Sequence, residues 1–362
     1  WMIKLFGTEY SKDELLKRVG DISQIAGVRQ VTLGDGPERG VRAVEFRTGT
    51  GLDFTVMADR GMDISSASYK GQSLAWRSST GDVFPSYYDS AGSGWLRSFP
   101  GGLLTTCGLT YAGAPCVDQG ENLGLHGRSS NIPASNVYAD AEWRGDDFVM
   151  WAQGRVREAA VFGENIEMVR TVTAKLGQAK IWVHDKVTNL GHSATEHMFI
   201  YHCNMGFPIV EKNSRLLANV KECRPRDAAA VPGIGEYKEL SQPIKDFAEQ
   251  VFYLDMAEDQ NGYVQVALVN EGFNNGQGFG ISMRYPKSEF PNFIEWKMMG
   301  EGMYITGLEP ANCLVEGRAK DRERGILQFL ESGETREYHM EFEVLTSRDA
   351  ICAVEKLIGE NR

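Results

Sequence analysis

Apolar and polar residues alternate with a period of two over most of the chain. Between residues 337 and 344, Tyr, Met, Phe and Val occupy every second position, and Glu and His occupy the others. Successive side chains of a strand point to opposite faces, so this pattern predicts a strand with one buried and one wet face. Similar patterns predict further strands at Val41–Phe46, Phe54–Met57, Phe148–Gln153, Ile166–Ala174, Lys180–Asn189, Val264–Asn270 and Phe279–Tyr285.

Helical periodicity occurs only near the two ends. Ser11 and Glu14 form a capping-box pattern that predicts a helix over about 11–20. Apolar residues at helical spacing predict a second helix over about 349–358. Strands and helices do not alternate in between, and no Pro/Ser-rich linker divides the chain. We therefore expect an all-β protein, a single antiparallel sandwich domain over residues 1–362.

Length and glycine content fit this expectation. At 362 residues the chain exceeds the ~250–300 at which one core usually stops growing, which by itself suggests two domains. A large sandwich of many strands can absorb that length. Glycine accounts for 40 of the 362 residues, about 11%, against a usual share of ~7%. The tight turns of an all-β protein explain such an excess.

The chain is acidic, with a net charge of −11. Such a charge repels polyanions, so nucleic acids and anionic membranes are not expected as partners. No stretch approaches ~18 apolar residues, and the N-terminal residues lack a signal-peptide core. The six cysteines include no C-x-x-C pair, which argues against a zinc site or a disulfide framework. The sequence thus predicts a cytoplasmic protein.

Two glycine-containing loops carry candidate binding residues. Arg60 and Asp63 follow an apolar strand, and taken alone this segment is better explained as a surface turn with a local ion pair. His126 lies in Leu123–Arg128 with glycine on both sides, and Arg128 follows. A histidine with so little packing around it indicates a ligand role about as strongly as it indicates a structural one.

Two later strands place ionisable groups at their ends. His202 and Asn204 share a strand face, while His197 points to the other face. Glu309 ends an apolar run, where burying an unpaired carboxylate is costly. A hydrogen-bonded core histidine and a solvent-facing glutamate are the structural alternatives. A histidine and a glutamate together suit proton transfer near neutral pH.

Two residues of the neighbouring Glu295-Trp296-Lys297 segment complete the candidate set. Trp296 can offer an apolar platform to a sugar ring, although a core position is the better explanation for any single tryptophan. Lys297 can add a positive charge. Glycines beside the candidates are expected to let a ligand approach: Gly61, Gly124, Gly127 and Gly307.

Taken in order, these motifs resemble the galactose mutarotase-like superfamily, and most closely its uncharacterised aldose 1-epimerase-like branch. Leu125-His126-Gly127, Tyr201-His202-Cys203-Asn204 and Gly307-Leu308-Glu309-Pro310 are similar to the family's two histidine motifs and its late glutamate motif. The resemblance covers roughly residues 41–344. It implies a β-supersandwich of large antiparallel sheets and interconversion of the α and β anomers of an aldose, with no metal or cofactor.

The resemblance also implies roles for individual residues. His202 would be the general acid, Glu309 the general base, and His126 would bind the sugar and help polarise its ring oxygen. The family's Asn-Arg pair is absent here, and Arg60 or Arg128 is expected to replace its arginine. The family's sugar-binding aspartate has two candidates, Asp246 and Asp255.

Two alternative functions remain open from the sequence, and the other histidines are expected to have no functional role. One alternative is a carbohydrate-binding or sensing protein without turnover. Another is an isomerase or lyase acting on a sugar acid or sugar phosphate, held by cationic side chains of this set: Arg60, Arg128, Lys297 and Arg318. The remaining histidines are expected to serve no site: His184 and His192 flank a turn, His197 faces away from the candidates, and His339 lies among glutamates.

Overall fold

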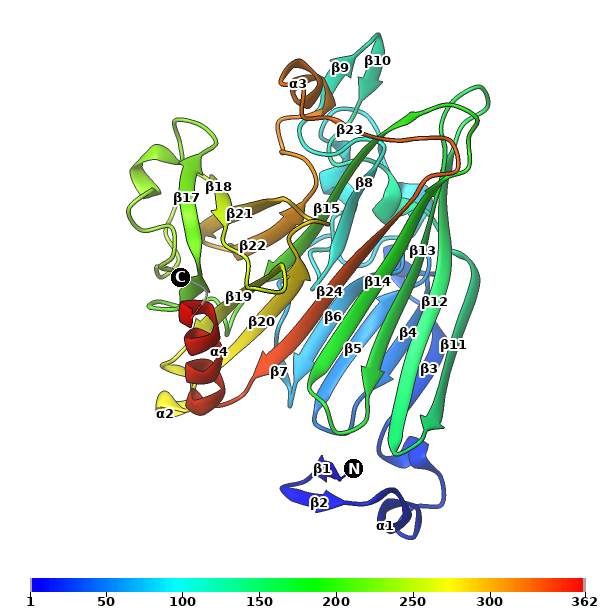
Figure 1. Cartoon of the computed structure of the whole chain (residues 1–362), viewed down its shortest axis with the longest axis vertical. Helices are drawn as coiled ribbons and strands as arrows, with labels where there is room; N and C mark the ends of the chain where they lie inside the picture. Colours follow the sequence, from blue (N-terminus) through cyan, green and yellow to red (C-terminus); the bar gives the residue numbers. More distant parts are fainter. Residues whose placement is uncertain (1, 361–362) are drawn as a thin grey trace.

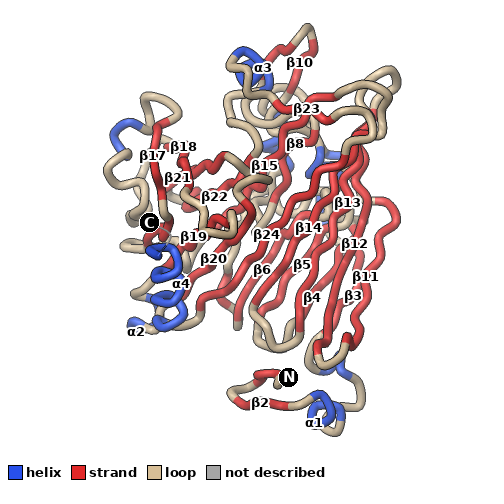
Figure 2. The backbone as a smooth tube through the Cα atoms, in the orientation of Figure 1, coloured by secondary structure: helices blue, strands red, loops and turns tan. Residues whose placement is uncertain are grey.

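The computed structural model describes residues 2–360 of the chain. Most of these residues form antiparallel strands in three large sheets, and the few helices lie at the periphery (Figures 1 and 2). The all-β class expected from the sequence is confirmed, and the architecture is a sandwich of large antiparallel sheets.

An eight-stranded sheet contains the longest strands and forms the front layer in Figure 1. Its strands, in spatial order, are β11 (Ser135–Arg144), β12 (Asp147–Ala159), β13 (Asn165–Lys175), β14 (Lys180–Asn189), β24 (Thr335–Leu345), β20 (Phe279–Pro286), β19 (Tyr263–Asn270) and β16 (Arg215–Ala218). Six of these strands were predicted from alternation, namely β12, β13, β14, β24, β20 and β19. Strand β11 and the short β16 were not predicted.

A five-stranded sheet lies behind it in Figure 1. Its strands are β3 (Gly27–Thr32), β4 (Arg42–Arg47), β5 (Leu52–Met57), β6 (Asp63–Tyr69) and β7 (Gln72–Ser73). Alternate residues of β4 and β5 enter the core, and Phe46 stacks on Phe54 with ring centroids 4.5 Å apart. Cross-strand aromatic pairs of this kind stabilise the sheet.

A seven-stranded sheet carries the candidate site. Its strands in order are β17 (Val220–Pro225), β18 (Gln250–Met256), β21 (Asn292–Gly300), β22 (Met303–Ala311), β15 (Thr195–Met205) and β23 (Gln328–Leu330), with β8 (Thr105–Leu109) paired to β15. Short hairpins are formed by β1 (Ile3–Leu5) with β2 (Thr8–Tyr10) and by β9 (Cys116–Asp118) with β10 (Glu121–Leu123).

The helices are short except for the last one. They are α1 (Lys12–Leu16), α2 (Phe273–Gly276), α3 (Arg318–Glu323) and α4 (Arg348–Glu360), with 3₁₀ turns at Ile22–Gln24, Gly36–Glu38, Pro85–Tyr87, Gly94–Ser98, Ser129–Asn131 and Val231–Gly233. The predicted capping box at Ser11 and Glu14 forms, but α1 ends at Leu16, earlier than the expected 20. Helix α4 covers the expected 349–358.

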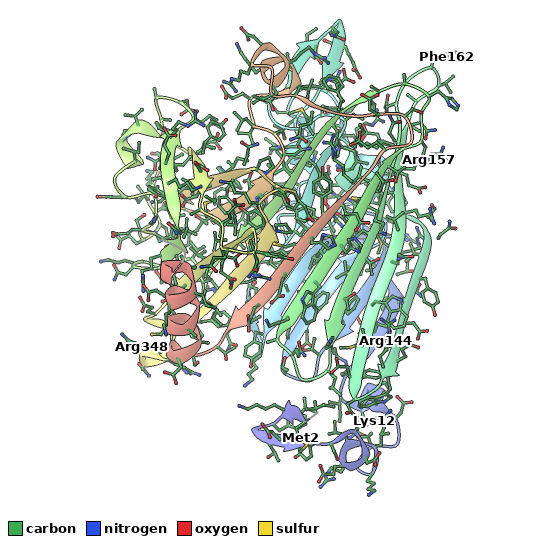
Figure 3. The ribbon with its side chains drawn as sticks, in the orientation of Figure 1. Met2, Lys12, Arg144, Arg157, Phe162 and Arg348 are labelled. Carbon is green, nitrogen blue, oxygen red and sulfur yellow. The ribbon has the colours of Figure 1, made fainter. Side chains whose placement is uncertain are left out.

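The β1–β2 hairpin and α1 lie at the lower end of the long strands in Figure 1. Lys12 donates a hydrogen bond to the Gly145 carbonyl and lies 4.8 Å from the Trp143 ring, which ties α1 to the β11–β12 turn. Figure 3 shows Lys12 near Arg144 at this end of the long strands and Phe162 at the other end. No helix within residues 2–360 is long and apolar enough to cross a membrane.

The main hydrophobic core lies between the sheets. It combines inward residues of all three, such as Phe54, Val172 and Phe199. A buried ionic network crosses this core. Arg170 on β13 binds Asp185 on β14 at 2.6 Å and Asp63 on β6 at 2.8 Å. The Tyr201 hydroxyl of β15 donates to Asp185 at 2.6 Å.

Candidate functional site

The site begins with the alternation of β15, the strand that passes through the middle of the molecule. Phe199 and Tyr201 point into the main core, whereas Ile200 belongs to a second apolar cluster on the opposite face. His202 shares that second face, as the sequence predicts. The seven-stranded sheet therefore packs on the other sheets with one face and presents His202 on the other.

The register between β15 and β22 brings the two predicted catalytic residues together. Cys203 pairs with Leu308 and Ile200 with Ala311, which sets His202 opposite Glu309. His202 Nε2 lies 3.3 Å from Glu309 Oε1, and the two residues are only 5% and 2% exposed. Residues more than 100 positions apart thus meet as a cross-strand pair.

Strand β21 supplies the next side chain on this face. Trp296 pairs with Gly307 of β22. A Cβ on Gly307 would lie 2.6 Å from Glu309 Oε1 and 3.2 Å from Trp296 Cβ. The glycine therefore makes room for the carboxylate itself, rather than for a ligand as the sequence suggested. The Trp296 ring meets the His202 ring edge-on, with centroids 5.5 Å apart.

Two loops form the opposite wall. Trp95, held by a hydrogen bond from its indole nitrogen to Ser130 Oγ, stacks on Phe99 at 4.5 Å. His126 lies between Trp95 and His202, with ring centroids 4.8 Å and 5.6 Å away. His126 adopts a φ of 58°, a region that side-chain-bearing residues rarely occupy and that concentrates at functional sites.

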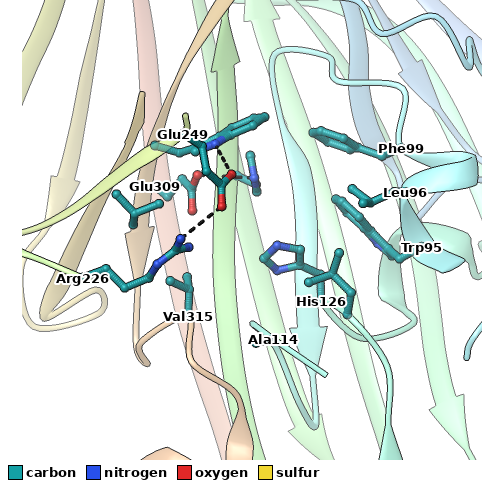
Figure 4. A pocket seen from close by; sticks show the side chains of 13 residues that line it. Trp95, Leu96, Phe99, Ala114, His126, Arg226, Glu249, Glu309 and Val315 are labelled. Carbon is teal, nitrogen blue, oxygen red and sulfur yellow. Dashed lines mark hydrogen bonds and ion pairs between the residues drawn. The ribbon is translucent and has the colours of Figure 1, made fainter. Parts of the chain in front are cut away.

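These walls enclose a pocket of about 270 Å³ (Figure 4). Its lining comprises Trp95, Leu96, Phe99, Ala114, Leu125, His126, His202, Arg226, Glu249, Val251, Trp296, Glu309 and Val315. Arg226 donates to Glu249 at 3.1 Å, and the Trp296 indole donates to the other oxygen of Glu249 at 2.9 Å, as the dashed lines in Figure 4 show. An apolar pocket with a few converging polar groups is typical of a small-molecule site.

Burial determines the electrostatics of the central pair. It lowers the pKa of His202 to about 4, although the Asn204 side chain opposes this, and it raises the pKa of Glu309 to about 8. Burial and the neighbouring His202 both lower the pKa of His126. Within the described residues, His202 Nδ1 and Glu309 Oε1 are buried polar atoms without a hydrogen-bond partner. Such atoms are costly unless a ligand satisfies them.

The predicted substrate-binding residues divide into two groups. His126 and Trp296 line the pocket; Arg60, Asp63, Arg128, Asn204 and Lys297 do not. The Arg60 guanidinium donates to the carbonyls of Ser130, Val83 and Ser98 and so fastens three loops together. The Lys297 ammonium donates to the carbonyls of Glu236 and Glu239.

Asp63 and Asn204 have structural partners as well. Asp63 accepts hydrogen bonds from the amide and hydroxyl of Thr106 and pairs with Arg170, while burial raises its pKa to about 6. Asn204 donates to the carbonyls of Gly102 and His202, which fixes the backbone beside the His202–Glu309 pair. These two residues and the exposed Arg128 all lie outside the pocket lining.

Two polar residues of the pocket lining, Arg226 and Glu249, were not predicted from the sequence. Asp246 and Asp255, its candidates for a sugar-binding aspartate, do not line the pocket, and Asp255 pairs with Lys287 instead. Arg226 follows β17 and Glu249 precedes β18. Their positions directly beside strands are the one sequence feature that could have indicated them. Many other charged residues of the chain have such positions, so this feature does not single them out.

The remaining predicted glycines contact the protein's own backbone. A Cβ on Gly61 would lie 2.7 Å from the Ser129 carbonyl oxygen, one on Gly124 2.2 Å from that of Ser90, and one on Gly127 2.4 Å from that of Tyr111. These glycines therefore permit close packing of the loops that position His126. Within residues 2–360, the one group of three side chains that could together hold a metal ion is His184, Glu337 and His339. It lies away from this pocket, on the eight-stranded sheet.

Several solved structures have the same fold as this chain. A Klebsiella pneumoniae protein provisionally described as an aldose 1-epimerase is 24% identical, with a TM-score of 0.88 over 99% of this chain and 94% of that one. A galactose mutarotase-like protein from Clostridium acetobutylicum is 12% identical, with a TM-score of 0.61 over 89% of this chain and 99% of that one. The fold is that of the galactose mutarotase-like proteins.

The galactose 1-epimerase of Lactobacillus acidophilus has the same fold at 10% identity, with a TM-score of 0.56 over 89% of this chain and 100% of that one. Comparison with curated protein sequences finds no match. Residues 38–344 match the family described as a domain of unknown function, DUF4432. The chain belongs to this family.

Proposed function

We propose that this protein is an aldose 1-epimerase that interconverts the α and β anomers of a neutral free sugar without a metal or cofactor. The observation that carries the proposal is the buried His202–Glu309 pair, 3.3 Å apart in a pocket and with unpartnered polar atoms on both residues. Proteins with this fold that are named as epimerases and mutarotases support the same reaction class.

The reaction requires one acid and one base on the same side of a sugar. Glu309 takes the proton from the anomeric hydroxyl while His202 gives a proton to the ring oxygen, so the C1–O5 bond breaks and an aldehyde forms. Rotation about the C1–C2 bond and reclosure on the other face of the carbonyl give the other anomer. The proton transfers then run in reverse, and the pair returns to its starting state.

The pair must hold one proton for this exchange. Burial favours neutral His202 and protonated Glu309 before substrate binds, because it penalises both charges. Moving that one proton from Glu309 to His202 gives the ion pair, so both arrangements hold the same number of protons. Hydrogen bonds from sugar hydroxyls to Glu309 stabilise its carboxylate and so favour the arrangement in which His202 is the acid.

The other lining residues suit a neutral sugar. Trp95, Phe99 and Trp296 offer apolar surface to the ring, and His126 offers a neutral imidazole near the ring oxygen. Arg226 and Glu249 together donate and accept hydrogen bonds, as adjacent hydroxyl groups require. Since Arg226 is already paired with Glu249 and Asp227, the pocket offers little net positive charge to an anion.

Two alternatives follow from the sequence. A binding or sensing protein would take up a sugar without accelerating its mutarotation. A lyase or isomerase for sugar acids or phosphates would need cationic residues in the pocket, but three of the four candidates are engaged elsewhere. Arg60 and Lys297 bind carbonyl groups, and Arg318 pairs with Asp118 and Glu121.

The test is the rate at which freshly dissolved α-aldoses change optical rotation, measured over a panel of hexoses and pentoses with the full chain. We expect acceleration for at least one sugar and a loss of about 10²–10⁴-fold in kcat/KM for Glu309→Gln and for His202→Asn. NMR of the products should show unchanged configuration at every centre except C1.

Matched controls come from outside the pocket. Glu301→Gln changes an exposed glutamate in the β21–β22 turn, and His192→Asn changes an exposed histidine; both should retain the wild-type rate. If calorimetry detects saturable sugar binding but no sugar mutarotates faster, the protein is a binding protein and the enzymatic proposal fails. A cytoplasmic location and the absence of nucleic-acid and membrane partners stay predictions.

A further inference from the structure

Two histidines face each other on the outer face of the eight-stranded sheet, away from the pocket. His184 of β14 and His339 of β24 are register partners, and their rings stack with centroids 4.3 Å apart. Neither was expected from the sequence to serve a site, because His184 was placed beside a turn and His339 among glutamates. The two positions are 155 residues apart, and strand pairing brings them together. His184 lies in the middle of its strand rather than beside the expected turn.

A carboxylate completes the cluster. Glu337 precedes His339 by two residues and therefore shares its face of β24. Its Oε2 lies 2.9 Å from His184 Nε2 and 3.9 Å from His339 Nε2. One nitrogen of each histidine and one oxygen of Glu337 lie within 4.8 Å of one another. Lys186 Nζ forms an ion pair with the other carboxylate oxygen of Glu337, Oε1, at 3.1 Å.

A second glutamate orients one of the histidines. Glu289 Oε1 lies 2.8 Å from His339 Nδ1, and Glu289 Oε2 accepts the His339 backbone N–H at 2.6 Å. A proton on Nδ1 satisfies this carboxylate and leaves the lone pair on Nε2, the nitrogen that faces Glu337. Metal-binding histidines in proteins are commonly held in this way by a carboxylate on the other ring nitrogen.

We propose that His184, His339 and Glu337 form a binding site for a divalent transition-metal ion of the zinc type, with Glu289 as the residue that orients His339. Two imidazole nitrogens and one carboxylate oxygen are the donor set of Zn²⁺ rather than of Ca²⁺ or Mg²⁺, which take oxygen ligands. Water fills the fourth position. Zinc–nitrogen bonds of about 2.0–2.1 Å require the three donors to draw together, and their partly exposed side chains can rotate to do so.

The site would join two strands from distant parts of the chain. β14 and β24 are neighbours in the sheet, but about 145 residues separate them in sequence. A metal that binds the folded chain and not the unfolded chain raises the unfolding temperature by mass action. The inference does not depend on the proposed epimerase activity, because the site shares no residue with the pocket.

The test is isothermal titration of ZnCl₂ into the full-length chain, free of any histidine tag and carrying Cys352→Ser, because Cys352 is an exposed free thiol. We expect saturable binding of one zinc ion per chain and a zinc-dependent rise in Tm. His184→Ala and His339→Ala should each abolish both effects. Glu289→Gln should weaken zinc binding by about 10–100-fold.

The matched control is His192→Ala, an exposed histidine outside the cluster, which should bind zinc like the parent chain. Circular dichroism before zinc addition confirms that each variant is folded; the substituted side chains are exposed or partly exposed and lie outside the core. Absence of saturable binding in the parent chain overturns the proposal. Zinc binding that persists in both histidine variants overturns it as well, because the ion then occupies other ligands.

Discussion

At the scale of single residues, burial changes the chemistry of two ordinary side chains. A solvated glutamate and a solvated histidine titrate near 4.3 and 6.5. In the pocket the order is reversed, because burial raises the pKa of Glu309 to about 8 and lowers that of His202 to about 4. His202 Nε2 and Glu309 Oε1 lie 3.3 Å apart, so one proton can pass between the two side chains.

This reversal predicts the pH dependence of the proposed reaction. Below about pH 4 both groups are protonated and no base is present, whereas above about pH 8 both are deprotonated and no acid is present. Between these values the pair holds one proton. We expect kcat/KM for mutarotation to be level across this range and to fall on both sides, measured by optical rotation and corrected for the buffer-catalysed rate.

A profile that instead changes between pH 4 and pH 7, with a single step near the ordinary pKa of histidine, would contradict the assignment. Glu301→Gln is the control, because it alters an exposed carboxyl outside the pocket and should leave both limbs of the profile in place.

At the scale of elements, strand register builds the site. Three neighbouring strands place Asn204, Gly307 and Trp296 in one row, and His202, Glu309 and Ile294 in the next row. Gly307 contributes by lacking a side chain, since the Glu309 carboxylate occupies the space where a Cβ would lie.

Gly307→Ala should therefore displace the carboxylate. A Cβ at 2.6 Å from Glu309 Oε1 forces the side chain to move, and a displacement of about 1 Å from the productive geometry can cost about 10²-fold in rate. We expect kcat for mutarotation to fall by about this factor, with the fold retained by circular dichroism.

Gly300→Ala is the matched control, since it adds a Cβ at the far end of β21. The nearest atom there is the terminal methyl of the flexible Met298, which can move aside. Equal loss of activity in the two variants would show that the effect arises from the sheet and not from Glu309.

At the scale of the whole molecule, one arginine connects the three large sheets. Arg170 is fully buried on the eight-stranded sheet, Asp63 belongs to the five-stranded sheet, and Tyr201 belongs to the seven-stranded sheet and reaches the network through Asp185. Removing one member of a buried ion pair leaves charges unpaired in the core.

Arg170→Met should destabilise the chain by about 3–5 kcal/mol in urea unfolding, because both Asp63 and Asp185 lose their counter-ion. Arg155→Met is the control: its pair with Glu167 on the neighbouring strands is partly exposed, so its loss should cost about 1 kcal/mol or less. Similar effects of the two changes would contradict a stabilising role for the network. The single-domain organisation over 1–362 stays a prediction.

The sequence by itself determined the class of fold and the candidate catalytic pair. Alternation reports which face of a strand is buried, and this depends only on neighbouring residues, so strands such as β14 and β24 were predicted closely. The order of the motifs around His126, His202 and Glu309 then indicated a family.

The tertiary structure decided which residues share a site, because distance in space depends on the pairing of strands far apart in the chain. It placed Arg226 and Glu249 in the pocket and gave Arg60 and Asp63 partners in the scaffold. It also brought His184 to His339. A local pattern can show that a side chain is buried, but only the fold shows what that side chain is buried against.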